Sequence, residues 1–281
     1  MSVKIITDSG SDISQKEAKE LGITVIPLTF RFHDREYIDG VTMSLEEFYQ
    51  HLEQEEELPK TSQITPYRYA EVFKEELKEN ESAIYISISS GVSGCYQSAL
   101  LAKQEVEGDL WVLDSQQFCG SMRVLVEFAA RLAREGKKAP EIYSCLIEAQ
   151  KKVRIIAVFA TLENLRKGGR ISSTAAFFGE AFSIKPVITI TDGKVNVLDK
   201  VRGMKKGFAA MRKYIEEDGG IDLSMPYCAA YTGTDPANIH KFLAENADLY
   251  GNREDIATSY VGTTVGTYAG AGAIATAYFV K

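Results

Sequence analysis

Serine and glycine residues gather between Ser87 and Ser98, where the chain reads Ser-Ile-Ser-Ser-Gly-Val-Ser-Gly-Cys-Tyr-Gln-Ser. An apolar run typical of a buried strand precedes this segment, and a helical pattern follows it. Gly91 and Gly94 let the backbone approach a ligand closely, and a strand-to-helix turn presents free N–H groups to an anion. Ser93 adds a hydroxyl donor, so the segment predicts an anion-binding turn. The alternative is a structural turn in which Ser93 caps the helix.

Ser93 is also a candidate nucleophile. Gly91-Val-Ser-Gly-Cys95 differs from G-x-S-x-G only at the last position. A catalytic triad also needs a histidine, and His240 is the only one downstream of this segment. The residues therefore leave open a serine acyl-hydrolase that uses Ser93 and His240, as the alternative to a binding protein.

Two other segments could contribute to a ligand site. Lys60-Thr-Ser-Gln-Ile-Thr-Pro66 is rich in hydroxyls, and it either supplies Thr61 to the same ligand or caps a helix that begins at Pro66. Val265 to Ala273 is rich in glycine and alanine, which predicts a turn packed closely around another group.

Basic residues flank a glycine pair between Thr161 and Ser172. Arg170 follows the glycines, and Lys200 and Arg202 follow a predicted hairpin. Together they predict a basic patch in an acidic chain, with a solvated charged face as the alternative.

Metal and cofactor sites are not expected. The acidic turn Thr7-Asp-Ser-Gly-Ser-Asp12 lacks a third carboxylate at ligand spacing, so we expect it to cap a helix. No C-x-x-C pair occurs, and the histidines are distant from the four cysteines Cys95, Cys119, Cys145 and Cys228. The sequence also lacks a G-x-x-x-x-G-K-[ST] loop, which excludes a P-loop nucleotide site.

The charge of the chain restricts its partners. The net charge is −7 over 281 residues, which argues against nonspecific nucleic-acid binding and against adsorption to an anionic membrane. No apolar run approaches the ~20 residues of a membrane span, and no signal peptide is expected. We expect a cytoplasmic protein without stable membrane insertion.

Alternating strand-like and helical patterns must position these residues. The predicted strands are 3–7, 24–30, 83–88, 110–113, 155–160, 187–191, 194–198, 227–231 and 256–260. The predicted helices are 14–21, 45–55, 67–79, 95–106, 118–135, 139–152, 203–217 and 236–246. The Ser44-x-x-Glu47 capping box and the Thr65-Pro66 start support two of these helices.

The order of the elements indicates an α/β fold in two domains. Alternation in the first half predicts a parallel sheet over residues 1–153. Asp192-Gly193 between two strand-like runs predicts a hairpin, and hence a mixed α/β domain over residues 154–281.

Taken together, these segments resemble the DegV family, which includes the fatty-acid-binding subunits of bacterial fatty acid kinase. The resemblance runs the whole chain and rests on the order and spacing of many pieces. They are Thr7-Asp-Ser, Lys60-Thr-Ser-Gln, Ser89 to Ala99, Asp114-Ser115, Thr161-Leu-Glu, Gly168-Gly-Arg-Ile-Ser172, Lys185-Pro186, Asp192-Gly193 and Lys200-Val-Arg202.

The resemblance implies site residues. Thr61 and Ser93 match the hydroxyls that hold the fatty-acid carboxylate. Where the family usually has Gly-Thr-His-x-Gly-Pro-Gly, this chain has Gly-Thr-Tyr-Ala-Gly-Ala-Gly, so Tyr268 replaces a histidine. A tyrosine still donates a hydrogen bond but stays neutral near pH 7. Arg170 and Arg202 match basic residues near the head group or the kinase-docking face.

The resemblance also implies a function. A long-chain fatty acid would lie buried between or within the domains, and a separate ATP-dependent fatty acid kinase subunit would convert its carboxylate to an acyl phosphate for phospholipid synthesis. The chain itself would perform no chemistry and need no cofactor. A sensor whose apolar ligand controls binding to another protein is a further possibility.

Overall fold

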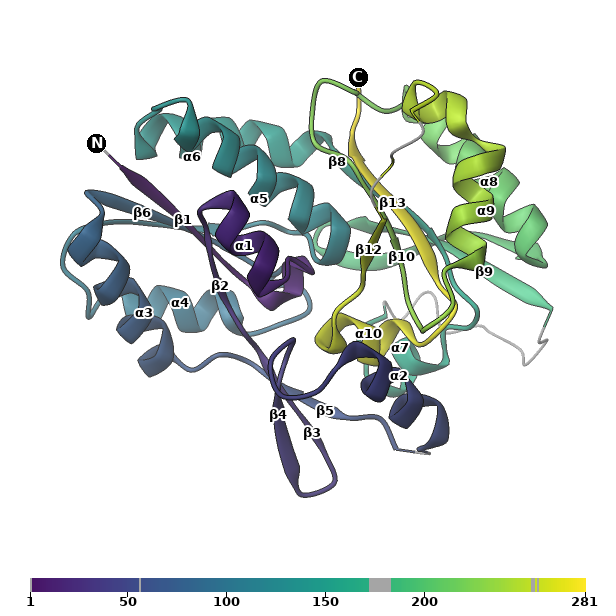
Figure 1. Ribbon diagram of the computed structural model, residues 1–281, viewed down its shortest axis with the longest axis horizontal. Helices are drawn as coiled ribbons and strands as arrows, with labels where there is room; N and C mark the ends of the chain where they lie inside the picture. The colour runs from purple at the N-terminus through teal and green to yellow at the C-terminus, as the bar shows by residue number, and fades with distance from the viewer. Residues whose placement is uncertain (1, 56, 172–182, 254–255, 257) are drawn as a thin grey trace.

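The computed structural model describes residues 2–55, 57–171, 183–253, 256 and 258–281. Figure 1 shows two large sheets side by side, each covered by helices, with a small sheet below them. This arrangement confirms the predicted fold class, a parallel α/β sheet followed by a mixed one.

The first sheet is parallel and has the strand order β2-β1-β6-β7. Its strands are β1 (Val3–Asp8), β2 (Thr24–Ile26), β6 (Ser82–Ser87) and β7 (Asp109–Asp114). Helices return the chain between parallel strands. One face of the sheet packs on α3 (Pro66–Glu79) and α4 (Cys95–Lys103), and the other on α5 (Cys119–Arg134) and α6 (Ala139–Ala149).

The second sheet is mixed, with the order β10-β9-β8-β13-β11-β12. Its strands are β8 (Val153–Val158), β9 (Ile184–Thr191), β10 (Lys194–Arg202), β11 (Cys228–Tyr231), β12 (Thr258–Tyr260) and β13 (Ile274–Phe279). Among the described strands of this sheet, β11 and β12 pair in parallel and the other neighbours pair antiparallel. Its outer face packs on α8 (Met204–Glu217) and α9 (Ala237–Glu245).

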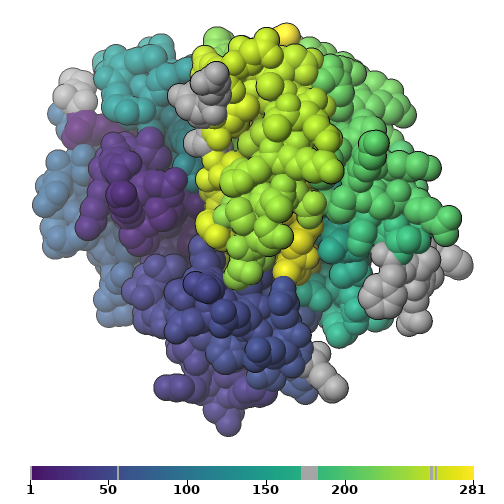
Figure 2. Space-filling view, turned by 45° about the vertical axis from the view of Figure 1, so that its right-hand side comes forward, coloured from purple at the N-terminus to yellow at the C-terminus, as the bar shows by residue number. Residues whose placement is uncertain are grey.

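A small antiparallel sheet completes the fold, with the order β4-β3-β5. Its strands are β3 (Thr29–Phe32), β4 (Arg35–Ile38) and β5 (Lys60–Ser62), and α2 (Leu45–Gln54) packs on it. Tyr49 of α2 donates a hydrogen bond to the Val261 carbonyl at 3.0 Å, just before α10 (Thr263–Ala269). Figure 2 shows the dark-blue surface of this unit against the yellow-green C-terminal segments. Residues near position 60 are thereby held beside residues near position 268.

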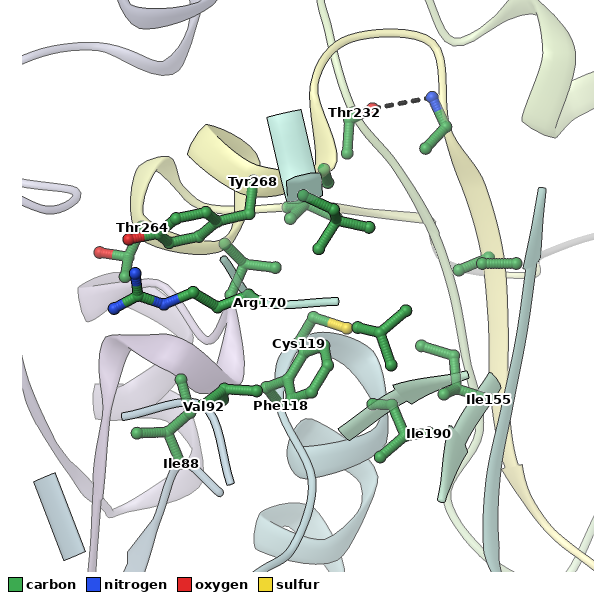
Figure 3. Close-up of a pocket in the computed structure, with 18 of the residues that line it drawn as sticks. Ile88, Val92, Phe118, Cys119, Ile155, Arg170, Ile190, Thr232, Thr264 and Tyr268 are labelled. Atoms are coloured by element: carbon green, nitrogen blue, oxygen red, sulfur yellow. Dashed lines mark hydrogen bonds between the residues drawn. The ribbon is translucent and has the colours of Figure 1, made fainter. Parts of the chain in front are cut away.

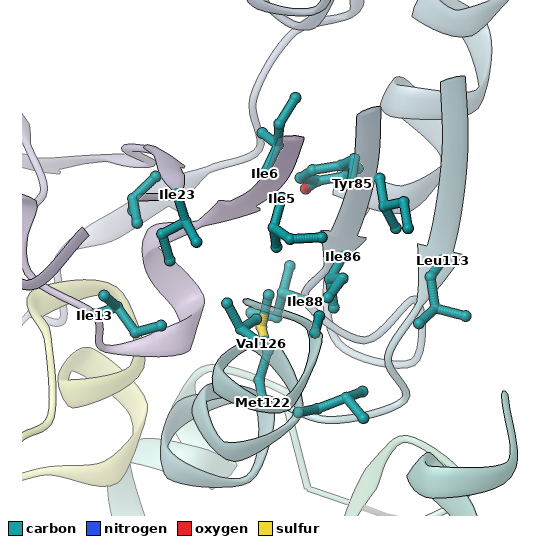
Figure 4. Close-up of a cluster of buried hydrophobic side chains, with 14 of the residues drawn as sticks. Ile5, Ile6, Ile13, Ile23, Tyr85, Ile86, Ile88, Leu113, Met122 and Val126 are labelled. Carbon is teal, nitrogen blue, oxygen red and sulfur yellow. The ribbon is translucent and has the colours of Figure 1, made fainter. Parts of the chain in front are cut away.

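Helix α5 lies between the two large sheets. Met122 and Val126 of α5 pack against Ile5 and Ile86 of the parallel sheet (Figure 4). On the opposite side Gly120 allows close approach, because a Cβ there would lie 3.3 Å from the Cβ of Ala277. One apolar cluster therefore joins both sheets. The parallel sheet ends before Val153 and the mixed sheet begins with it, and the division into domains 1–153 and 154–281 stays a prediction.

Several local predictions are confirmed. Ser44 and Glu47 form a capping box, and Thr65 caps α3 before Pro66. The hairpin turns at Asp192-Gly193, where both residues have positive φ angles. The remaining elements are α1 (Gln15–Leu21), α7 (Glu163–Lys167) and the 3-10 helices Ser9–Ser11, Gln150–Lys152 and Ala247–Tyr250.

Two local predictions are wrong. The predicted strand 24–30 is two strands in different sheets, because Pro27 between them has no N–H to continue a ladder. The predicted turn at 265–273 begins as the helix α10, which ends at Gly270 with a φ of 68°. Among the described residues, no helix has the length and apolar character needed to cross a bilayer.

Candidate functional site

A cavity of about 450 Å³ lies where the three sheets meet. Its volume falls within the range of about 300–1,000 Å³ that is typical of small-molecule sites. Its walls come from the mixed sheet, the small sheet, the loops that follow β2 and β6, the start of α5, α7 and α10. The lining residues used below are Thr61, Ser93, Phe118, Cys119, Ile155, Ala157, Phe159, Arg170, Ile188, Ile190, Thr232, Thr264, Tyr268 and Ala275.

Most of the cavity wall is apolar. Ile155 and Ala157 of β8 and Ile188 and Ile190 of β9 alternate along their strands, so each pair faces the same side of the mixed sheet. Figure 3 shows Ile155 and Ile190 at the end of the cavity away from Arg170 and Tyr268. The cavity is therefore an apolar chamber with one polar end.

Two hydroxyls from distant parts of the chain meet at the polar end. Thr61 Oγ1 and the Tyr268 hydroxyl lie 2.6 Å apart, within hydrogen-bond distance. The guanidinium of Arg170 lies over the Tyr268 ring, 4.8 Å from its centroid. Such a cation–π contact fixes the ring while leaving the hydroxyl available to a ligand.

Glycine at position 168 makes room for this arrangement. Gly168 follows α7, and a Cβ there would collide with the Tyr268 ring. The next residue, Gly169, has a φ of 69°, a conformation that glycine adopts without strain. Arg170 then donates a hydrogen bond to the Gly168 carbonyl at 2.6 Å, which folds the loop under the tyrosine.

Ser93 reaches the cavity from the turn between β6 and α4. Gly94, not Ser93, is the N-cap of α4, so the interpretation of Ser93 as the cap is wrong. The Ser93 hydroxyl accepts a hydrogen bond from the Cys95 N–H at 3.3 Å. A side chain at Gly94 would collide with Gln63, so glycine lets this turn approach the segment that carries Thr61.

Two of the other hydroxyls that line the cavity have hydrogen-bond partners. Thr264 donates a hydrogen bond to Asp39 at 2.8 Å, and Thr232 accepts one from the Ala273 N–H at 2.8 Å. Figure 3 draws the second bond as a dashed line. Sequence analysis did not identify Thr232 or Thr264 as lining residues, because their hydrogen bonds form only in the folded chain.

The thiol in the wall stays neutral. Burial raises the pKa of Cys119 well above its ordinary value. Arg170 is the only charged residue among the described residues that line the cavity, and it lies at the polar end. The interior is therefore suited to an uncharged, apolar group.

A second cavity, of about 490 Å³, adjoins the first and is called the outer cavity below. Thr61, Arg170 and Tyr268 line both, so the hydroxyl pair stands between them. The outer cavity is also lined by Glu57, Leu58, Pro59, Lys60, Lys167 and Gly168. Three of its lining residues are cations, Lys60, Lys167 and Arg170, and one, Glu57, is a carboxylate. The outer cavity therefore attracts anions, although the net charge of the chain is −7.

Four of the predicted residues come together, and two do not. Thr61, Ser93, Arg170 and Tyr268 all line the first cavity. Arg202 lies exposed at the end of β10, and its Nε donates to Ser183 at 3.4 Å. His240 is exposed on α9 and is absent from the described lining, so the structure gives no support to a pair of Ser93 and His240.

The acidic turn at the end of β1 caps a short helix within itself, and the next helix, α1, is capped by Ser14 instead. Asp8 accepts a hydrogen bond from the Gly10 N–H at the start of the 3-10 helix Ser9–Ser11. Within the described ranges, no three or more His, Cys, Asp or Glu side chains form a group that would hold a metal ion.

Comparison with known proteins places this site in a family context. A family model described as "Uncharacterised protein, DegV family" matches residues 2–281. A DegV domain-containing protein of Caldanaerobacter subterraneus is 40% identical over 218 residues, which cover 77% of this chain and 78% of the relative.

Two solved structures share the whole fold. A DegV family protein of Thermus thermophilus, described as binding fatty acid, superposes with a TM-score of 0.89 at 29% identity, over 100% of both chains. DegV of Bacillus subtilis, described as a fatty acid binding protein, superposes with a TM-score of 0.87 at 28% identity, again over 100% of both chains. With a family model that spans nearly every residue, these likenesses show that the chain belongs to the DegV family.

Proposed function

We propose that this protein binds one long-chain fatty acid in the cavity and presents its carboxylate to a separate, ATP-dependent fatty acid kinase subunit in the cytoplasm. The observation that carries the proposal is the character of the site, an apolar chamber whose lining includes the hydroxyl residues Thr61, Ser93 and Tyr268. The fatty-acid binding described for the two solved relatives supports the same ligand class.

The apolar chamber provides the driving force for binding. Each buried methylene contributes about 0.8 kcal/mol, so a C16 tail contributes on the order of 10 kcal/mol before costs. Loss of motional freedom removes several kcal/mol of this. The remainder alone corresponds to a Kd of about micromolar or weaker, and hydrogen bonds to the charged carboxylate, of about 1.5–3 kcal/mol each, bring the expected affinity into the submicromolar range. Ile155, Ile188, Ile190 and Phe159 would contact the tail.

The carboxylate needs donors because an unpaired charge is costly in a dry site. The hydroxyls of Thr61, Ser93 and Tyr268 are the donors we assign to it. Their geometry requires a change when the ligand binds, since Thr61 and Tyr268 are hydrogen-bonded to each other. While this bond lasts, only one of the two hydroxyls can donate to the carboxylate, and both can donate only after the bond between them breaks.

The outer cavity would connect the carboxylate to the kinase. Lys60, Lys167 and Arg170 line it and would attract the anionic groups of a phosphoryl donor. Arg170 and Arg202 are the residues we assign to the head group or to the docking face. Arg202 is exposed outside the cavity, which suits docking rather than ligand contact.

Titration of delipidated protein with palmitate tests the first half of the proposal. We expect submicromolar affinity at a stoichiometry of one, and no binding of hexadecane, which lacks a carboxylate. Addition of a purified fatty acid kinase subunit and ATP tests the second half, with acyl phosphate expected only when all three components are present. Failure to bind palmitate contradicts the whole proposal, whereas binding without phosphoryl transfer contradicts only the kinase role.

A p-nitrophenyl ester assay addresses the hydrolase alternative. We expect no turnover above the uncatalysed rate. Turnover that both Ser93→Ala and His240→Ala abolish would replace the carrier with an enzyme.

A further inference from the structure

A buried serine, Ser89, joins the turn that carries Ser93 to the mixed sheet. Ser89 lies two residues after β6 and is 0% exposed. Its hydroxyl donates a hydrogen bond to the Gly193 carbonyl at 2.8 Å and accepts one from the Gly91 N–H at 3.0 Å. Gly193 belongs to the tip of the β9–β10 hairpin, 104 positions further along the chain. One hydroxyl therefore bonds to both the turn and the hairpin tip.

The backbone of Ser89 fixes the same turn. Its carbonyl accepts hydrogen bonds from the N–H groups of Val92 at 3.2 Å and of Ser93 at 3.1 Å. Its N–H donates to the Gln117 carbonyl at 2.9 Å, one residue before Phe118. Val92, Ser93 and Phe118 all line the cavity, and Figure 3 labels the first and the last of them. The hydrogen bonds of Ser89 therefore hold several parts of the ligand site together.

Two glycines allow the turn and the hairpin tip to approach this closely. A Cβ at Gly91 would lie 2.6 Å from the Gly193 carbonyl oxygen, and a Cβ at Gly193 would collide with the Ser89 hydroxyl. Gly193 also has a φ of 73°, which glycine adopts without strain. The two segments are therefore in direct contact, and a side chain at either glycine would force them apart.

The hairpin also contributes to the wall of the chamber. Ile190 of β9 and Val195 of β10 are paired across the hairpin, close to its tip, and both line the cavity. The sides of the hairpin thus face the space that we assign to the acyl tail. Its tip bears on the turn that carries Ser93, which we assign to the carboxylate.

We propose that Ser89 is a positioning residue for the ligand site, which holds its turn against the hairpin tip so that Ser93 donates a hydrogen bond to a bound carboxylate. This inference rests on the proposed fatty-acid binding. It extends the site to a residue that is absent from the described lining of the cavity. Without the Ser89 hydroxyl, the Gly193 carbonyl and the Gly91 N–H lose a partner, and separation of the two segments lets water satisfy both groups.

Binding of palmitate and of 1-hexadecanol by Ser89→Ala tests this role, because the two ligands share a tail and differ in the charge of the head group. A displaced Ser93 costs more for a carboxylate, since hydrogen bonds to charged groups contribute more than neutral ones. We expect the Kd to rise about tenfold for palmitate and about threefold or less for hexadecanol. Equal rises for both ligands overturn the proposal, because they indicate damage to the chamber around the shared tail.

A double variant tests whether Ser89 acts through Ser93. When Ser93→Ala is already present, Ser89→Ala should change the palmitate Kd by less than about twofold, because the hydroxyl that it positions is absent. In the otherwise wild-type protein the same substitution should raise the Kd about tenfold. Losses that multiply in the double variant show that the two serines act independently, and they overturn the proposal.

Ser11→Ala is the matched control. It removes another 0% exposed serine hydroxyl, which donates to the Asp8 carbonyl at 2.9 Å and is absent from the described lining. Its Kd values for both ligands should equal those of wild type. Gly91→Ala keeps the Ser89 hydroxyl but forces the turn away from the hairpin tip, so it should lose palmitate selectively and serves if Ser89→Ala does not fold. A selective loss in Ser11→Ala as large as in Ser89→Ala overturns the proposal.

Amide hydrogen exchange of the ligand-free protein separates this proposal from the fatty-acid site. Peptides that cover residues 90–93 and 192–195 should both exchange faster in Ser89→Ala than in wild type, because the turn and the hairpin tip lose their link together. Ser11→Ala should leave both unchanged. If palmitate does not bind to wild type but both peptides exchange faster in Ser89→Ala, the fatty-acid site fails and the link stands. Unchanged exchange at residues 192–195 overturns the proposal even if palmitate binds.

Discussion

The hydroxyls of Thr61 and Tyr268 lie 2.6 Å apart although 207 positions separate the two residues in the chain. Thr61 lies on an edge strand of the small sheet, and Tyr268 on a helix between two strands of the mixed sheet. The contact depends on α2, which packs on the small sheet and bonds to Val261 just before that helix. Folding of the whole chain therefore builds the polar end of the cavity.

Removal of the tyrosine hydroxyl tests its role in binding. Tyr268→Phe keeps the ring under Arg170 but removes a donor to the carboxylate. A hydrogen bond to a charged group contributes about 1.5–3 kcal/mol, so palmitate affinity should fall by about 10- to 100-fold. Calorimetric titration measures this change. Tyr67→Phe, at an exposed position on α3, is the control, and equal affinities for both variants would remove Tyr268 from the site.

Restoring the residue that is usual in the family should introduce a charge. Tyr268→His places an imidazole with an ordinary pKa of about 6.5 at the carboxylate. We expect its palmitate affinity, relative to wild type, to rise as the pH falls from about 8 to about 5.5, because the protonated ring adds an ionic attraction. A relative affinity that is the same at both values would contradict this assignment.

The residues of the polar end could be predicted, but their assembly could not. Ser93 and Thr61 were predicted from hydroxyl-rich segments and Arg170 from a basic patch, and the family resemblance added Tyr268 and assigned Arg170 to the head group or the docking face. The helix that carries Tyr268 escaped prediction because its glycine and its three threonines are poor helix formers. In the structure Asp39 accepts hydrogen bonds from the N–H and hydroxyl of Thr263 at its start, a tertiary contact with no local signal.

The cavity itself was also beyond sequence reasoning. The alternation in β8 and β9 indicates which side chains share a face, but not whether that face is packed or hollow. Strand β13, at the centre of the mixed sheet, was missed because alanines make Ile274–Phe279 weakly apolar. Small side chains at Ala273 and Ala275 help to leave the chamber open.

The role of the Ser93 hydroxyl can be tested against that of Ser90, which lies in the same turn. Ser93→Ala should weaken palmitate binding by about tenfold or more while leaving thermal unfolding close to wild type, since the hydroxyl is half-buried. Ser90→Ala alters an exposed serine that bonds to Asp114 outside the cavity, and it should bind as wild type. If both variants bind equally well, Ser93 does not contact the carboxylate.

A larger side chain in the chamber should select against long tails. Ala157 is buried on β8 and lines the cavity, so Ala157→Leu reduces the space for the acyl chain. If the acyl chain meets an overpacking cost of about 1–3 kcal/mol, palmitate affinity falls by about 5- to 150-fold, and we expect a smaller loss for decanoate. Affinities for the two acids, with exposed Ala237→Leu as control, measure this selectivity. Equal losses for both chain lengths would show that Ala157 does not limit the tail.

The stability of the protein should depend on pH through Asp12. Its Oδ2 is buried with no hydrogen-bond partner among the described residues, and burial raises its pKa well above the ordinary value. The folded state therefore favours the protonated form, and the stability that this form contributes is lost as the pH rises through the folded pKa. Asp12→Asn lacks this loss, so its free energy of unfolding relative to wild type should increase with pH. Urea unfolding at about pH 5 and about pH 8 measures it, and a constant difference would contradict the assignment.

Native mass spectrometry of the protein purified from bacterial cells tests the central claim most directly. We predict a species heavier than the chain by the mass of one long-chain fatty acid, which solvent extraction releases and identifies, and which is depleted in Tyr268→Phe and Ser93→Ala. A chain found only at its own mass, which also gains no mass when palmitate is added, would contradict the account.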